Sequence, residues 1–267
     1  MRWEHLEYNS SPVDWCENNY VVSSNIAEFV NTISNIFFLL GPPILIYLFK
    51  DYGKFIHPVI HVIWVLLIVV GLSSAYFHAT LSLIGQLLDE ISILWVFMVT
   101  LTFFCPRRYF PSICNNSRKK FSTAMGTLSC LCTILSFWKP AINNVALFAL
   151  VVPALYLMSQ ELKRVKDKRV YRLGIRSISI LFLAILCWVN DRLFCATWSA
   201  INFPYLHGFW HIFIFIAAYC SCVLFAYFFV SDEYPGAGKL KYWPNNEFEF
   251  GVPYISVCSY KKIRDNI

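Results

Sequence analysis

Seven long apolar stretches, separated by short polar segments, dominate the chain. They lie at residues 28–49, 59–80, 86–104, 121–138, 141–160, 173–194 and 207–230. Each is close to the roughly 20 residues that a helix needs to cross the hydrocarbon layer of a membrane. Only Lys139 and Pro140 separate the fourth stretch from the fifth, so that boundary is the least distinct. The pattern predicts an all-α integral membrane protein, a bundle of seven transmembrane helices.

The composition agrees with this class. Of 267 residues, 58% are hydrophobic and 14% are charged, which is more apolar surface than one soluble core of this size needs. The first 27 residues hold acidic side chains and no apolar core, so they do not resemble a cleavable signal peptide. We therefore expect one seven-helix membrane domain over residues 1–230, which includes an N-terminal segment at 1–27, followed by a tail at 231–267.

Basic residues are distributed unequally between the two sides of the predicted bundle. The loops on the side of the N-terminus hold three Lys and Arg, and those on the side of the tail hold eighteen. Because cytosolic loops carry an excess of Lys and Arg, we expect a lumenal or exterior N-terminus and a cytosolic C-terminus. The net charge of +6 is then a topology signal. No basic patch indicates nucleic acid, and nothing indicates an obligate protein partner.

Two of the ten cysteines, Cys16 and Cys195, lie outside the spans on the predicted lumenal side. This is the compartment in which a disulfide forms and persists. We predict that they pair and join the N-terminal segment to the sixth loop. Two free thiols are the alternative, because the sequence does not give the distance between them. Asn9 begins a glycosylation sequon on the same side.

Ionisable residues within the spans gather near the lumenal surface, and such residues usually face a cavity or a partner. His78 closes the second span, Asp89 and Glu90 begin the third, and His207 and His211 begin the seventh. The i, i+4 spacing puts His207 and His211 on one helical face, and His78 can supply a third nitrogen. Three protein ligands with an open fourth position are typical of catalytic zinc. Polar packing between helices is the alternative interpretation.

His57 and His61 share the same i, i+4 spacing at the cytosolic end of the second span. Roughly 25 Å of helix separates His61 from His78, and no third histidine or carboxylate cluster accompanies the pair. We interpret them as interfacial side chains, which makes them a matched control for the lumenal histidines.

Oxygen donors gather in the segment VDWCENNY (13–20) and at the start of the first span. They are Asp14, Glu17, Asn19 and Glu28, with the backbone carbonyl of Trp15 as a fifth donor. Hard oxygen ligands of this kind suit calcium. The spacing is not that of an EF-hand, and acidic residues at a helix start are often simple caps. Both interpretations stay open.

These residues fall in stretches that resemble the alkaline ceramidases, seven-helix zinc hydrolases related to the adiponectin and progestin receptors. The matching stretches are VDWCENNY, IAEFVNTISN (26–35), GLSSAYFHATLSLIGQLLDE (71–90), WVNDRLFC (188–195) and NFPYLHGFWH (202–211). They follow the family order over about residues 11–255. The loops PRRYFP (106–111), KPAINN (139–144) and NFPYLH resemble the Golgi type more than the endoplasmic reticulum type.

The resemblance implies zinc-dependent hydrolysis of the ceramide amide bond to sphingosine and a free fatty acid, with ceramide bound within the bilayer. It implies zinc on His78, His207 and His211, and catalytic roles for Ser74 and Asp89. It also implies calcium at Asp14, the Trp15 carbonyl, Glu17, Asn19 and Glu28, and a disulfide between Cys16 and Cys195.

In the chemistry that fits, Ser74 donates to the developing oxyanion, and Asp89 carries a proton from water to the leaving amine. Glu90 is the nearest rival for the second role. A receptor of the adiponectin or progestin type is the alternative function. A proton-coupled transporter would distribute polar groups through the depth of the membrane, whereas here they gather at one end.

Overall fold

The computed structural model describes residues 4–257, and within that range seven helices are long and apolar enough to cross a membrane. They are α1 and α2 together (Phe29–Leu48), α4 (Val59–Thr80), α5 (Leu83–Phe104), α6 (Arg118–Trp138), α7 (Ala141–Arg164), α8 (Lys168–Leu193) and α10 (Leu206–Glu233). Each of the seven predicted spans corresponds to one of them, so the prediction of an all-α, seven-span membrane protein is confirmed.

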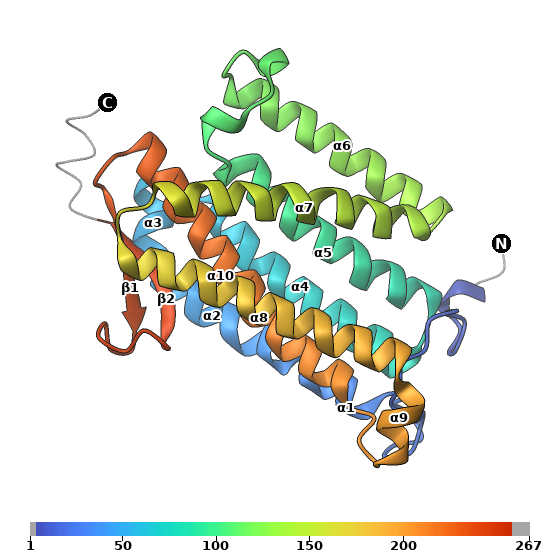
Figure 1. The fold of residues 1–267 in the computed structure, drawn as a ribbon. Helices are drawn as coiled ribbons and strands as arrows, with labels where there is room; N and C mark the ends of the chain where they lie inside the picture. The colour runs from blue at the N-terminus through green and yellow to red at the C-terminus, as the bar shows by residue number, and fades with distance from the viewer. Residues whose placement is uncertain (1–3, 258–267) are drawn as a thin grey trace. The chain divides into compact units, whose positions relative to one another are not determined.

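Several helices extend beyond the apolar stretches, as α6 does at Arg118 and α8 at Lys168. Backbone hydrogen bonding decides where a helix ends, and Lys, Arg and Glu are good helix formers. The break between α6 and α7 is at Lys139, which has extended backbone angles (φ −140°, ψ 101°). The residue before a proline is pushed into this region, so Pro140 ends α6 and lets α7 run back beside it (Figure 1).

Short elements connect the spans. The first span is divided at Asn35 into α1 (Phe29–Ser34) and α2 (Ile36–Leu48). The other short helices are η1 (Glu4–Leu6), α3 (Lys50–Phe55), η2 (Arg107–Tyr109), η3 (Ser112–Cys114) and α9 (Cys195–Ala200). Two strands follow α10, β1 (Gly238–Trp243) and β2 (Val252–Val257).

The chain forms two compact units. The first contains the residues up to Gly41, Leu67–Ile93 and Ser177–Ala218, and the second contains Pro42–Leu66, Leu94–Arg176 and the chain from Tyr219. All the candidate metal-binding and catalytic residues belong to the first unit. His57, His61 and the two strands belong to the second.

In the first unit, the N-terminal segment is hydrogen-bonded to the end of α4. The amide of Ala27 donates to the carbonyl of Ala79 and that of Glu28 to the carbonyl of His78, both at 3.0 Å. The last four carbonyls of a helix have no partner within the helix, and here the segment supplies donors for three of them, because the amide of Asn9 also donates to the carbonyl of Thr80 at 3.0 Å. This pairing fixes the segment directly against the turn of α4 that carries His78.

In the second unit, β1 and β2 form an antiparallel pair that the sequence analysis did not predict. Leu240 lies opposite Ile255 and Tyr242 opposite Pro253, and these four residues are buried. Directly opposed residues share a face of a two-stranded sheet, so one face of the hairpin packs against its unit. The alternate residues of β1 are exposed.

Candidate metal centre

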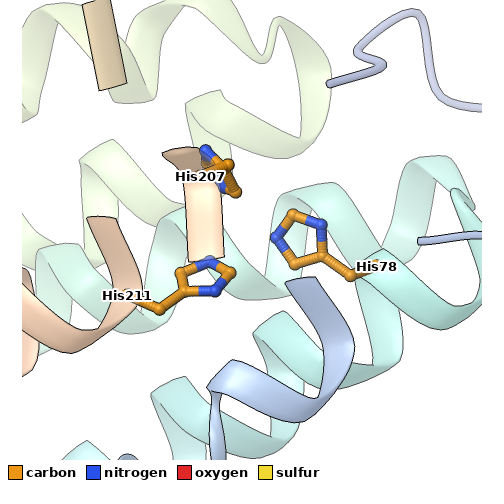
Figure 2. Close-up of side chains that lie close together, drawn as sticks. All are labelled: His78, His207 and His211. Atoms are coloured by element: carbon orange, nitrogen blue, oxygen red, sulfur yellow. The ribbon is translucent and has the colours of Figure 1, made fainter. Parts of the chain in front are cut away.

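Three imidazoles meet in the first unit, one from α4 and two from α10 (Figure 2). The centroid of the His78 ring lies 5.0 Å from that of His207 and 4.8 Å from that of His211. The centroids of His207 and His211 are 4.6 Å apart. One nitrogen from each ring lies within 4.8 Å of the others. All three side chains are buried, so the one-turn spacing on α10 does bring both rings to one face.

The ring nitrogens have the chemistry of a cation site. Nε2 of His78 and Nδ1 of His207 are buried, and neither has a hydrogen-bond partner among residues 4–257. A buried polar atom without a partner costs free energy, and a metal ion would remove that cost by accepting the lone pairs. The three histidines are the only His, Cys, Asp or Glu cluster in the described part of the chain that is tight enough to share one ion.

Two side chains from around the first span orient two of the rings. Oε2 of Glu28 lies 2.5 Å from Nδ1 of His78, and Oγ of Ser34 lies 2.7 Å from Nδ1 of His211. Ser34 has one hydroxyl proton, and it is directed to the carbonyl of Asn31 at 2.9 Å. With the Ser34 proton on the Asn31 carbonyl, Nδ1 of His211 is the donor to Ser34. A proton on Nδ1 fits both contacts, and in that tautomer Nε2 of each ring is the ligand atom.

The two candidate catalytic residues come together. Ser74 is buried one turn before His78 on α4, and its hydroxyl lies close enough to the carboxylate of Asp89 on α5 to interact with it. Glu90, the rival, is turned to a different partner, because Nε2 of Gln86 donates to its Oε1 at 2.9 Å. The contact with Ser74 therefore distinguishes Asp89 from its neighbour.

The candidate calcium ligands lie close together but use most of their oxygens on protein donors. Both oxygens of Glu17 accept main-chain N–H groups, from Val30 at 2.7 Å and Asn31 at 2.8 Å. Glu17 therefore caps α1, as the simpler interpretation of this segment expects. Oε1 of Glu28 accepts from the amide of Trp15 at 3.0 Å. These carboxylates do not form a cluster as tight as that of the histidines.

Two observations nevertheless favour a cation beside Asp14. The side-chain nitrogen of Asn19 donates to Oδ1 of Asp14 at 3.1 Å, and Oδ1 of Asn19 is buried with no partner in the described structure. Burial raises the pKa of Asp14 and of Glu17, and the charge of Glu28 raises both further. A divalent ion would relieve that repulsion and supply the missing partner.

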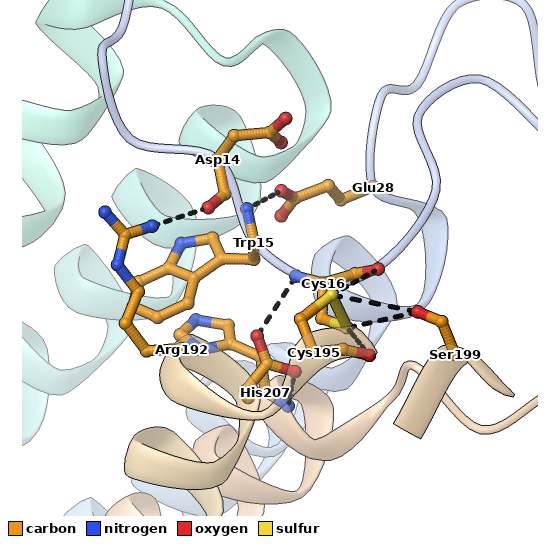
Figure 3. Close-up of a disulfide and its surroundings, with 9 residues drawn as sticks. Asp14, Trp15, Cys16, Glu28, Arg192, Cys195, Ser199 and His207 are labelled. Atoms are coloured by element: carbon orange, nitrogen blue, oxygen red, sulfur yellow. Dashed lines mark hydrogen bonds between the residues drawn. A yellow bond between two sulfur atoms is a disulfide. The ribbon is translucent and has the colours of Figure 1, made fainter. Parts of the chain in front are cut away.

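A disulfide joins Cys16 to Cys195 at the start of α9, with 5.3 Å between the Cα atoms (Figure 3). Side chains at the end of α8 and at the start of α10 contact the same segment. Nη1 of Arg192 donates to the carbonyl of Asp14 at 2.9 Å, and the indole of Trp15 stacks on the ring of His207 with 3.7 Å between centroids. The disulfide therefore lies next to the metal centre.

Asp191 is a site residue that the sequence analysis did not single out. Its side chain is 2% exposed, and its two oxygens accept the main-chain N–H groups of Cys16 at 3.1 Å and His207 at 3.2 Å. The carboxylate thus connects the disulfide segment to the first turn of α10, which carries two of the three histidines. The signal available in the sequence was an acidic residue within a span, in WVNDRLFC.

His57 and His61, the matched pair of the second unit, join no such cluster among the described residues. The ring of His57 packs against aromatic rings, with centroids 5.5 Å from Phe103 and 5.6 Å from Phe104. Burial lowers the pKa of His57. Histidine spacing alone therefore did not produce a metal-like site.

Comparison with known proteins agrees with this architecture. A sequence model of the ceramidase family matches residues 7–256. The chain is 63% identical over 258 residues to the alkaline ceramidase of Drosophila melanogaster, with 96% of this chain and 91% of the relative covered. It is 39% identical to human alkaline ceramidase 1, covering 94% and 95%, and 30% identical to the Caenorhabditis elegans alkaline ceramidase, covering 96% of each. The chain belongs to the ceramidase family.

Proposed function

We propose that this protein is an alkaline ceramidase that hydrolyses the amide bond of ceramide to sphingosine and a free fatty acid. The observation that carries the proposal is the meeting of three buried imidazoles, with two unpartnered ring nitrogens in the described structure, in a member of the ceramidase family. The relatives compared above are named alkaline ceramidases. Helices that cross a membrane suit a lipid substrate that stays in the bilayer.

We infer that the metal is zinc, held by His78, His207 and His211. Three neutral imidazoles with an open fourth position suit zinc. When bound, zinc supplies the Lewis acidity that makes a water molecule acidic near neutral pH and polarises an amide carbonyl. Glu28 and Ser34 support this role, because each holds the Nδ1 proton of one ring and thereby leaves its Nε2 free for the ion.

Ser74 and Asp89 are suited to move the proton that hydrolysis requires. Water adds to the carbonyl carbon, the C–N bond breaks, and one water proton must reach the departing amine. Asp89 takes this proton and later donates it to the amine. We infer that the Ser74 hydroxyl donates a hydrogen bond to the nearby Asp89 carboxylate in the resting state and is released when Asp89 becomes protonated. It can then donate to the developing oxyanion.

We further propose that calcium binds beside Asp14, with the Trp15 carbonyl, Glu17, Asn19 and Glu28 as its other ligands. The unpartnered Oδ1 of Asn19 supports this. Capping by Glu17 is compatible with it, because a carboxylate has about four lone-pair sites and Glu17 uses two of them. Calcium would act indirectly, by fixing the segment that contacts His78 through Glu28 and His207 through Trp15.

The distribution of Lys and Arg supports an N-terminus in the lumen and a tail in the cytosol. A disulfide on the N-terminal side agrees with an oxidising lumen. The loops that resemble the Golgi type lead us to propose the Golgi membrane, with the endoplasmic reticulum as the alternative.

The deciding experiment measures ceramide hydrolysis and metal content in one purified sample. Wild-type protein should contain about one zinc per chain and release fatty acid from ceramides. His78→Ala, His207→Ala and His211→Ala should each lose zinc and lower kcat/KM at least ~1,000-fold, since a Lewis acid contributes several kcal/mol. His57→Ala and His61→Ala are the matched controls and should retain both. Full activity in a zinc-free variant would refute the proposal.

A further inference from the structure

The last residue of β1 and the turn that follows it carry three exposed aromatic side chains that the proposed chemistry does not use. Trp243, Phe248 and Phe250 are 43%, 54% and 79% exposed, and the rings of Phe248 and Phe250 are 6.0 Å apart. We call these three residues the aromatic tip. Large apolar side chains gathered on one exposed turn indicate a surface that something else covers.

The turn that carries the tip is attached to the first turns of α8. Nε of Arg172 donates to the Glu249 carboxylate at 2.8 Å, and Nε of Arg169 lies 3.3 Å from it. Arg176 donates to the main-chain carbonyl of Glu249, and its guanidinium lies 5.0 Å from the centre of the Phe250 ring. These contacts fix the turn along two turns of a helix that enters the membrane.

The position of Arg176 sets the depth of the tip. Between Arg176 and Asp191 the helix has no charged residue. A helix needs roughly 20 residues to cross the hydrocarbon layer. If the span ends at Asp191, its other boundary is therefore near Tyr171. Arg176 therefore lies about one turn inside the boundary, where a charge is costly and needs a partner. The tail supplies it, through the Glu249 carbonyl and the Tyr242 hydroxyl at 3.2 Å.

We propose that the aromatic tip is a membrane anchor, and that its partner is the bilayer that the spans cross, at the level of the headgroups and upper acyl chains. Aromatic side chains are enriched at that level. Phe250 covers Arg176 on one side and is otherwise exposed, so its free face meets lipid. Lys239 and Lys241, exposed on the same side of β1 as Trp243, suit anionic headgroups. The tail is thus bound to the membrane surface along α8.

Site-specific photocrosslinking tests this assignment. The full-length protein, with p-benzoylphenylalanine at Phe248 or Phe250, is placed in nanodiscs of phosphatidylcholine and phosphatidylserine, irradiated and analysed by mass spectrometry. Phospholipid adducts should be at least 5-fold more abundant at either position than at Asn116, an exposed polar loop residue. Adducts to another protein chain, or lipid adducts no more frequent than at Asn116, would overturn the proposal.

A second arm tests the attachment to α8 while sparing the buried arginine. Glu249→Gln removes the charge that Arg169 and Arg172 hold and leaves Arg176 with its carbonyl partner. Lipid adducts at Phe250 should fall at least 2-fold in this variant, and Glu247→Gln, an exposed neighbour, should leave them unchanged. If the yield of lipid adducts at Phe250 is the same in Glu249→Gln as in Glu247→Gln, the contacts of Glu249 with α8 do not position the aromatic tip.

Discussion

The carboxylate of Glu28 lies 2.5 Å from Nδ1 of His78, and both side chains are fully buried. The same carboxylate accepts hydrogen bonds from the main-chain amide of Trp15 and from the side-chain nitrogen of Asn31. One residue of the N-terminal segment therefore has two roles, because it organises a loop and sets the proton position on a candidate zinc ligand. Carboxylates that accept the second N–H of a metal-bound histidine tune the affinity for the metal.

Glu28→Gln should weaken zinc binding more than it weakens folding. The amide keeps the size of the side chain but loses the charge that stabilises the Nδ1–H tautomer of His78, so zinc affinity should fall about 10- to 100-fold. Competition with a zinc chelator measures this, at a calcium concentration shown to saturate the variant as well as the wild type, because Glu28 is also a proposed calcium ligand. Glu7→Gln, an exposed carboxylate of the same segment, is the control. Unchanged zinc affinity in Glu28→Gln would contradict the role.

Asp191→Asn should disturb the metal centre from a distance. An amide has one oxygen, so one of the two N–H groups that Asp191 accepts, from Cys16 or His207, loses its partner at a cost of about 1–3 kcal/mol. We expect lower thermal stability and faster zinc loss. Asp51→Asn replaces an exposed aspartate and should change neither. A wild-type rate of zinc release in Asp191→Asn would show that Asp191 stabilises the fold alone.

Calcium removal should separate stability from zinc content. A ligand at 100 times its Kd stabilises a fold by about 2.7 kcal/mol, so chelating calcium should lower the melting temperature and turnover while zinc stays bound. Asp14→Asn is the informative variant, because Asp14, unlike Glu17, makes no cap to α1. It should remove most of the calcium dependence. If Asp14→Asn responds to calcium as wild type does, the ion binds elsewhere.

Peptide mapping without reduction should recover Cys16 and Cys195 as one linked peptide. The double variant Cys16→Ser with Cys195→Ser should lower thermal stability, because the crosslink closes a long loop and limits the unfolded chain. Cys130→Ser, at an exposed free cysteine, should not. Recovery of both thiols free from native membranes would contradict the disulfide and the lumenal position of the segment.

Acidification should release the tail hairpin from the first turns of α8. The hydrogen bond from Arg172 lowers the pKa of Glu249 below its usual value of about 4.3. A lowered pKa in the folded state means that the unfolded state binds more protons over this interval. The stabilisation is therefore complete above that value and is lost as the pH falls through the folded-state pKa. Proteolysis of the tail should increase below pH ~4 in wild type and be independent of pH in Glu249→Gln.

The seven spans were predictable because each is a continuous apolar stretch in the sequence. The cluster of histidines was predictable because all three lie at the same side of the membrane and the i, i+4 spacing puts two of them on one helical face. Their supporting contacts were not. Glu28 contacts His78, and Asp191 contacts the amide of His207, because of how the loops cross the helix ends. The conformation of such loops has no periodic pattern in the sequence from which it could be predicted. The hairpin was missed because β1 is short and lies in a polar tail, although its alternating Lys239, Leu240, Lys241 and Tyr242 carry a weak strand pattern.

The disulfide spans 179 residues of sequence, and this separation orders events during synthesis. A nascent chain that has not yet reached Cys195 holds Cys16 as a free thiol and presents only one of the three imidazoles. Glu28 and His78 are synthesised early, whereas α10, which carries the other two histidines, is the last span to be inserted. The proposed metal site can consequently be completed only late in biogenesis, and a chain truncated before Leu206 has membrane helices but lacks His207 and His211.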